Sequence, residues 1–129
     1  MTSLIAAPAE DRLRTVLALD GLIVGLSGVV LAATPASWYG DLPEWLVRAA
    51  AIVLVLGALG VGIASRWRGQ RLRIAGTATA ELAFVWTVMA VAAAALGQVR
   101  VAGLEALAFS GLATLVFGTL ETSLVRALR

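Results

Sequence analysis

The chain has 129 residues, of which 60% are hydrophobic and 14% are charged, with a formal net charge of +2. Ordinary soluble domains contain roughly 45–50% apolar and about 25% charged residues, and a soluble chain as apolar as this one lacks the polar side chains needed to cover its surface. Neither Cys nor His is present, which excludes disulfides, thiol nucleophiles, imidazole catalysis and metal sites built on these residues. The composition therefore predicts a single domain, residues 1–129, that is surrounded mostly by lipid.

Four apolar segments are long enough to cross a bilayer, because a transmembrane helix needs about 20 residues to span a hydrocarbon core of about 30 Å. The predicted spans are Leu13–Ala33, Trp45–Ala64, Ile74–Leu96 and Val101–Val125. Pro43 followed by Glu44 is typical of a helix start, and Gly97 suits a helix end. Since the connections are short, we expect an all-α, antiparallel bundle of four transmembrane helices.

The basic residues, all of which are arginine, indicate how the spans are oriented. Eight of them lie on one side of the predicted bundle, namely Arg12, Arg14, Arg66, Arg68, Arg71, Arg73, Arg126 and Arg129. Arg48 and Arg100 belong to the other side. Cytoplasmic loops carry the excess of basic residues, so we expect a multi-pass plasma-membrane protein with both termini in the cytoplasm. The arginines form no basic stripe with interleaved aromatic residues, so no nucleic-acid partner is expected.

The start of the chain allows a second interpretation. Arg12, Arg14, the apolar run and the small residues 31–36 resemble a cleavable signal peptide. However, the apolar run of about 20 residues is longer than the usual h-region, and it contains Asp20. We therefore favour a first helix that is retained.

The two halves of the chain, residues 10–66 and 71–127, align without gaps. The coinciding pairs include Arg12 with Arg73, Asp20 with Glu81, Glu44 with Glu105 and Gly57 with Gly118. Charged residues are scarce in this chain, so their coincidence predicts two tandem two-helix repeats. Two spans per repeat would give both halves the same orientation across the membrane.

Three carboxylates lie within the predicted spans, toward the arginine-rich side. At a rise of 1.5 Å per residue, Asp20 and Glu81 lie roughly 10 Å deep and Glu121 about 5–8 Å deep. A charged carboxylate at mid-span costs about 2.5–3.5 kcal/mol, and the spans contain no Lys or His to neutralise it. Either the three acids face one hydrated chamber, or some are protonated, or arginines such as Arg14, Arg66, Arg73 or Arg126 fold back toward them.

Helical spacing extends each carboxylate into a polar stripe. The candidate ligand-binding residues on or beside these stripes are Ser27, Thr77, Trp86 and Thr114. We expect the hydroxyls of Ser27, Ser110 and Thr114 to bond to their own helices. The alternative is a structural role, in which the acids only hold neighbouring helices together.

Glycines are the expected points of close approach between helices, because they allow two backbones to come together. The glycines that the sequence suggests for this role are Gly57, Gly60 and Gly62 in the second span.

Short motifs mark most of the spans. They are Leu17-Ala18-Leu19-Asp20, Leu42-Pro43-Glu44-Trp45-Leu46-Val47-Arg48, Glu81 followed by Trp86, and Leu120-Glu121. Together they resemble a largely uncharacterised group of small four-span integral membrane proteins of actinobacteria, whose members often carry Asn at the position of Glu81. The resemblance implies the four-span architecture and the positions of Asp20, Trp86 and Glu121. It implies no activity.

The leading hypothesis is an intramembrane pocket that binds a lipophilic small molecule and performs acid–base chemistry on it, as a cyclase, an isomerase or an epoxide-opening enzyme would. Asp20 and Glu81 would form the acid–base pair, and Glu121 would adjust their proton affinities. The sequence has no nucleophile–base motif, phosphate loop or metal-ligand spacing, so no cofactor or metal is expected. The alternatives are a proton-coupled exporter acting as a homodimer, and a non-catalytic subunit or assembly factor.

Overall fold

The computed structural model describes residues 2–41, 43–96 and 101–128, with the backbone alone for residues 2–8, 101 and 102. The elements in chain order are α1 (Thr2–Ala33), the short 3-10 helix η1 (Ala36–Trp38), α2 (Glu44–Ala64), α3 (Gly69–Ala95) and α4 (Val101–Ala127). The protein is all-α, and each α-helix is long and apolar enough to cross a membrane, which confirms the prediction of four such helices. The predicted break at residues 97–100, with Arg100, and the terminal Arg129 lie outside the described residues.

Two helices begin earlier than the hydrophobic segments that predicted them. α1 begins at Thr2 and α3 at Gly69, because hydropathy marks only the part of a helix that suits lipid, whereas the backbone hydrogen bonds continue into polar sequence. In the polar part of α1, Arg14 pairs with Asp11 at 3.8 Å, a spacing that supports an exposed helix. α2 begins at Glu44, directly after Pro43, as predicted.

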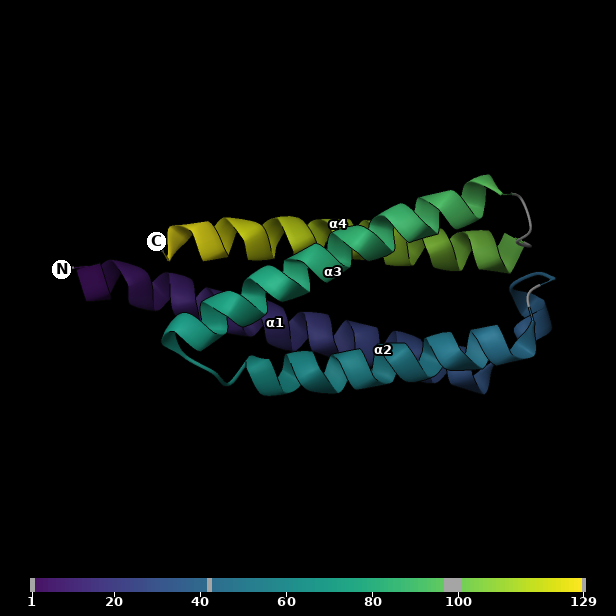
Figure 1. Ribbon diagram of the computed structural model, residues 1–129, viewed down its shortest axis with the longest axis horizontal. Coiled ribbons are helices and arrows are strands. Elements are labelled where there is room, and N and C mark those ends of the chain that lie inside the picture. The colour runs from purple at the N-terminus through teal and green to yellow at the C-terminus, as the bar shows by residue number, and fades with distance from the viewer. Residues whose placement is uncertain (1, 42, 97–100, 129) are drawn as a thin grey trace.

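The helices form two hairpins, α1 with α2 and α3 with α4 (Figure 1). Both termini and the α2–α3 connection lie at one end of the molecule, here called the terminal end, and the α1–α2 connection lies at the other, the distal end (Figure 1). Contacts are extensive within each hairpin, whereas contacts between the hairpins run mainly along α1 and α4. The fold therefore has one interface, between the hairpins, that is looser than the others.

The close approach of α1 to α2 depends on glycines of α1. A Cβ added at Gly28 would lie 2.8 Å from a methyl group of Val55, so only glycine fits there without a shift. The expectation for α2 is wrong for Gly57 and Gly60, because a Cβ added at either would meet no atom within 4 Å in the described part of the chain. Gly62 does lie at the contact, since its backbone nitrogen is 3.4 Å from a Cβ added at Gly21 of α1. Spacing alone did not reveal which helix of the pair carries the small residues that matter.

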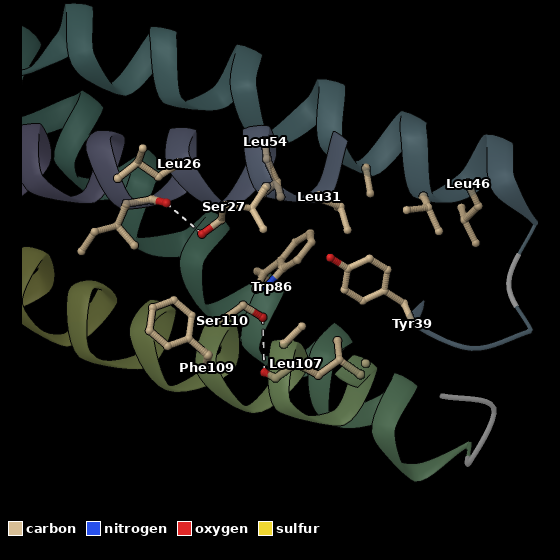
Figure 2. A pocket seen from close by; sticks show the side chains of 16 residues that line it. Leu26, Ser27, Leu31, Tyr39, Leu46, Leu54, Trp86, Leu107, Phe109 and Ser110 are labelled. Atoms are coloured by element: carbon tan, nitrogen blue, oxygen red, sulfur yellow. Dashed lines mark hydrogen bonds between the residues drawn. The ribbon is translucent and has the colours of Figure 1, made fainter. Parts of the chain in front are cut away.

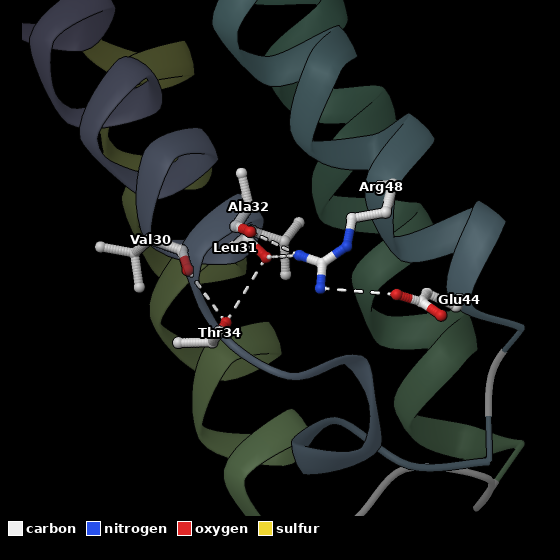
Figure 3. A network of polar contacts seen from close by, with 6 residues as sticks. All are labelled: Val30, Leu31, Ala32, Thr34, Glu44 and Arg48. Atoms are coloured by element: carbon white, nitrogen blue, oxygen red, sulfur yellow. Dashed lines mark hydrogen bonds and ion pairs between the residues drawn. The ribbon is translucent and has the colours of Figure 1, made fainter.

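Two arginines join α1 to α2, one at each end of the first hairpin. Arg14 Nε donates to the backbone oxygen of Ser65, at the C-terminus of α2, at 3.0 Å. Arg48 Nη1 donates to two backbone oxygens in the last turn of α1, and its other terminal nitrogen pairs with Glu44 at 3.8 Å (Figure 3). A cation there offsets the negative end of the helix dipole and satisfies carbonyls that lack intrahelical partners. Arg48, the exception to the orientation pattern, therefore has a structural role.

The two hairpins join at the terminal end. Leu13 and Leu17 of α1, Leu72 of α3 and Val125 of α4 are at most 5% exposed and form one core cluster. Gly76 of α3 lets them meet, since a Cβ added there would lie 2.8 Å from Val125 and 3.2 Å from Leu13. Toward the distal end the hairpins separate (Figure 1), and the space between them forms the cavity described next.

Candidate functional site

A cavity of about 500 Å³, here called the distal pocket, lies between the two hairpins in the distal half of the molecule. All four α-helices contribute to its walls, and the α1–α2 connection contributes Tyr39 (Figure 2). The lining residues are Ile23, Leu26, Ser27, Val30, Leu31, Tyr39, Leu46, Val47, Ala50, Leu54, Trp86, Gly103, Ala106, Leu107, Phe109 and Ser110. Four of these side chains carry a polar atom, so the pocket is an apolar space with few points of polar recognition.

Two of the four polar side chains are serines that bond to their own helices, as predicted. Ser27 Oγ donates to the backbone oxygen of Ile23 at 2.8 Å, and Ser110 Oγ donates to that of Leu107 at 3.2 Å (Figure 2). A serine nucleophile needs a neighbouring base that accepts its proton. Both hydroxyls face backbone carbonyls instead, so neither is arranged as a nucleophile.

Tyr39 reaches the distal pocket from the connection between α1 and α2. The next residue, Gly40, has a φ of 134°, a backbone conformation that glycine adopts readily and that lets the chain turn directly after Tyr39. The hydroxyl of Tyr39 bonds to Thr34 Oγ1, whose own proton points to the backbone oxygen of Val30 at 2.9 Å. Because a hydroxyl has a single proton to donate, Tyr39 is the donor in this pair.

Asp20 and Glu121 meet where α1 packs against α4, between the core cluster and the distal pocket. Asp20 is 5% exposed and Glu121 is 0% exposed, and their carboxyl groups lie close enough to interact electrostatically. Apart from the Asp20 carboxyl group, neither carboxyl oxygen of Glu121 has a hydrogen-bond partner among the described residues. The sequence placed these two acids at a similar depth, and the structure brings their side chains together.

Two of the arginines that were candidates to neutralise the buried acids, Arg14 and Arg73, bond to other groups. Arg14 bonds to the end of α2 and pairs with Asp11. Arg73 Nη1 bonds to Gln70 Oε1 at 3.3 Å. In the described ranges no ion pair joins an arginine to Asp20 or Glu121, so arginine compensation does not explain their burial.

Glu81 does not join the other two acids. It is exposed on α3 and lines a separate groove of about 360 Å³ toward the terminal end. The residues around this groove are Gln70, Arg73, Ile74, Thr77, Ala78, Glu81 and Val125. The prediction of one chamber shared by three carboxylates is therefore wrong for Glu81. Residue number fixes depth along a helix, whereas the direction of a side chain depends on which face of the helix packs.

The predicted ligand-binding residues fall into three places. Ser27 and Trp86 line the distal pocket. Thr77 lines the groove with Glu81, and its hydroxyl donates to the backbone of its own helix. Thr114 Oγ1 lies 2.7 Å from Thr87 Oγ1, so these hydroxyls join α3 to α4, and Thr114 lines neither space. The sequence indicated Tyr39 as part of an aromatic belt at the outer membrane surface and not as a pocket residue, because its inward position depends on the turn around η1.

No group of three or more His, Asp or Glu side chains within the described residues is arranged to hold a metal ion. Comparisons with protein-family models, with curated proteins and with solved structures find no match to this chain. The resemblance to small four-span actinobacterial membrane proteins stays a prediction. The assignment of function therefore depends on the distal pocket and on the buried carboxyl pair.

Proposed function

We propose that this protein is an integral membrane protein that binds a lipophilic small molecule in the distal pocket. The observation that carries the proposal is a cavity of about 500 Å³ with walls from both hairpins and a nearly continuous apolar lining. Small-molecule sites measure roughly 300–1,000 Å³ and are mostly apolar with a few placed polar groups. A charged ligand would lose its hydration in such a space without gaining partners, which favours a lipophilic one.

The proposal includes a topology. The four helices form an antiparallel bundle in the plasma membrane, with the terminal end in the cytoplasm. Arg12 and Arg14 belong to the first half of α1, and residues 66–73 cover the α2–α3 connection and the start of α3. These segments form the terminal end (Figure 1), in agreement with the excess of basic residues on cytoplasmic sides. The distal pocket then lies in the outer half of the bilayer. In this proposal the two tandem repeats expected from the sequence are the two hairpins.

A matched pair of substitutions on α2 tests ligand binding. Ala50 lines the distal pocket, whereas its neighbour Ala49 is exposed and lies outside the lining. Ala50→Phe should fill part of the cavity and lower the amount of lipophilic compound that co-purifies in mild detergent, measured by extraction and mass spectrometry. Ala49→Phe should carry the wild-type amount. Equal ligand content in the two variants would show that the cavity is not the binding site.

If the protein is an enzyme, we propose that it catalyses an acid–base reaction of the bound ligand. Asp20 precedes the pocket residue Ile23 by about 4.5 Å along the helix axis, so a ligand that extends past Ile23 would reach the carboxyl pair. A positioned acid and base are sufficient for cyclisation, isomerisation or epoxide opening. Asp20→Asn should then abolish conversion of the co-purified compound, while Glu81→Gln, in the separate groove, should not. Unchanged conversion in Asp20→Asn would exclude this chemistry.

Proton-coupled transport is the second candidate, and the position of the buried pair favours it. Asp20 and Glu121 lie at the contact between hairpins and outside the pocket lining. Acidic side chains inside membrane-spanning helices are costly and often belong to proton relays of pumps and transporters. Binding or loss of a proton at Asp20 or Glu121 would change the contact between α1 and α4. Because this contact joins the two hairpins beside the distal pocket, such a change would also alter the width of the pocket.

The two candidates predict different responses to ligand. Adding the co-purified compound to ligand-free protein in weakly buffered detergent should release protons if binding and protonation are coupled. The release should disappear in Glu121→Gln and persist in Glu81→Gln. Product formation without proton release would favour the enzymatic form instead.

A further inference from the structure

The polar atoms of the distal pocket differ in how well they are satisfied. The hydroxyl protons of Ser27 and Ser110 are donated to backbone oxygens, and Tyr39 donates to Thr34. These three oxygens therefore have only lone pairs to offer a ligand. The indole N–H of Trp86 is the exception, because it has no hydrogen-bond acceptor among the described residues. Figure 2 shows its nitrogen on the side of the ring that faces Ser110.

The depth of Trp86 restricts what can accept this hydrogen bond. Trp86 lies nine residues before the last residue of α3, Ala95, which corresponds to about 13.5 Å along the helix. In a hydrocarbon core of about 30 Å this is close to the midplane. The carbonyls and headgroups of ordinary phospholipids lie at the interface, outside that core. An acyl chain that entered the pocket would leave the N–H without a partner, which is unfavourable in hydrocarbon.

We propose that the ligand of the distal pocket is a lipophile with a carbonyl oxygen inside its apolar body, a ketone or a quinone, and that Trp86 Nε1 donates a hydrogen bond to that oxygen. This inference rests on the proposed function and names the class of molecule bound. A carbonyl oxygen accepts this hydrogen bond and brings no donor of its own. An alcohol or an acid also brings a proton, which would have to reach one of the hydroxyl oxygens of Ser27, Tyr39 or Ser110. The rest of the molecule would contact leucine, valine and phenylalanine side chains.

The test compares two probes that differ only at the carbonyl, 9-heptadecanone and heptadecane, both tritiated. Binding to the full chain in nanodiscs is measured at equilibrium and corrected for partition into empty nanodiscs. Trp86→Phe keeps an aromatic ring in the wall and removes the N–H. Trp45→Phe is the control, because Trp45 is 70% exposed and lies outside the pocket lining.

Wild-type protein should bind the ketone more tightly than the alkane. Trp86→Phe should weaken ketone binding about 2- to 13-fold, the range expected for loss of one hydrogen bond, and leave alkane binding unchanged. Trp45→Phe should change neither. The carbonyl stretch of ¹³C-labelled ketone should shift to lower frequency on binding to wild-type protein, and this shift should be lost in Trp86→Phe.

The possible failures are distinguishable. If both probes bind equally well and Trp86→Phe changes neither affinity nor carbonyl frequency, the carbonyl assignment is overturned while the lipophilic pocket stands. If neither probe binds wild-type protein above partition, the inference and the proposed function are both overturned.

Discussion

The terminal and distal halves of the molecule pack differently. In the terminal half, Leu17, Leu72 and their neighbours are almost completely buried between the hairpins, and the Gly69 N–H donates to Glu10 Oε1 across them at 3.3 Å. In the distal half the hairpins leave a cavity of about 500 Å³. Lipid chains are as apolar as leucine, so no hydrophobic force closes such a gap in a bilayer. Interlocking side chains and hydrogen bonds decide where hairpins meet.

In the described part of the distal half, the polar contacts lie within each hairpin and none joins the two hairpins. Arg48 ties α2 to the end of α1, and Thr87 ties α3 to Thr114 of α4. Each wall of the pocket is therefore held to its own partner helix. The comparison teaches that a cavity can persist in a small bundle when each wall is bonded to its own partner helix and the two hairpins pack together elsewhere.

The largest effect is expected from truncating the core cluster. Leu17 is completely buried, whereas Leu26 lines the pocket and is 58% exposed. Leu17→Ala should lower the free energy of unfolding by about 2–4 kcal/mol because it leaves a cavity, and Leu26→Ala should change it by less than about 0.5 kcal/mol. Helix content during titration from mild detergent into SDS measures both. Equal losses in the two variants would remove the distinction between the halves.

The next largest effect is expected at the close contact between α1 and α2 in the first hairpin. Gly28→Ala places a Cβ 2.8 Å from Val55 and 3.1 Å from the backbone oxygen of Ala51, and a backbone oxygen cannot move aside. We expect a loss of about 1–3 kcal/mol from overpacking. Gly60→Ala, where an added Cβ meets no described atom within 4 Å, should be neutral or slightly stabilising in the same titration. A neutral Gly28→Ala would contradict the described contact.

A smaller effect is expected at Arg48. Arg48→Gln removes the cation from the C-terminus of α1 and should lower stability by about 1 kcal/mol. Arg48→Lys should retain part of the stabilisation, because the positive charge remains while the planar geometry of the guanidinium donors is lost. Hydrogen exchange of the last turn of α1 should rise most in Arg48→Gln. Exchange that rises equally along all helices would argue against a local clamp.

The smallest expected effect is at the threonine pair of the second hairpin. A double-mutant cycle with Thr87→Val and Thr114→Val should give a coupling free energy of about 0.6 kcal/mol, the average for such bonds in a membrane. The thermal unfolding of the four proteins in one detergent provides the cycle. Strict additivity would mean that the hydrogen bond does not hold α3 to α4.

The three carboxylates show which parts of the candidate site could be predicted from the sequence. Hydropathy and residue number gave the depth of Asp20 and Glu121, and these two acids do meet. Glu81 has a depth similar to that of Asp20 and aligns with it in the predicted repeat, yet it is exposed. α3 is apolar on most of its surface, so its sequence pattern does not determine how the helix is rotated. Gly76, packed against Leu13 and Val125, identifies the face that packs, and only the structure shows it.

The sequence predicted a pocket within the helices, but it did not predict where in the bundle that pocket lies. The sequence pointed to Ser27 and Trp86 as ligand contacts, and both line the pocket. It assigned them to a chamber around the acids, because spacing along a helix cannot reveal that two hairpins diverge. The angle between hairpins depends on which small residues meet across the junction, and that is a property of four helices together.

The central claim, that the hairpins are joined beside Asp20 and Glu121 and separated at the pocket, can be tested directly by cross-linking, since the chain has no cysteine. Two double variants are oxidised in native membranes with copper phenanthroline, Asp20→Cys with Glu121→Cys, and Ser27→Cys with Ser110→Cys. The account predicts rapid disulfide formation in the first pair, and in the second a cross-link only with a longer bismaleimide. Equal oxidation rates, or faster oxidation of the pocket pair, would contradict it.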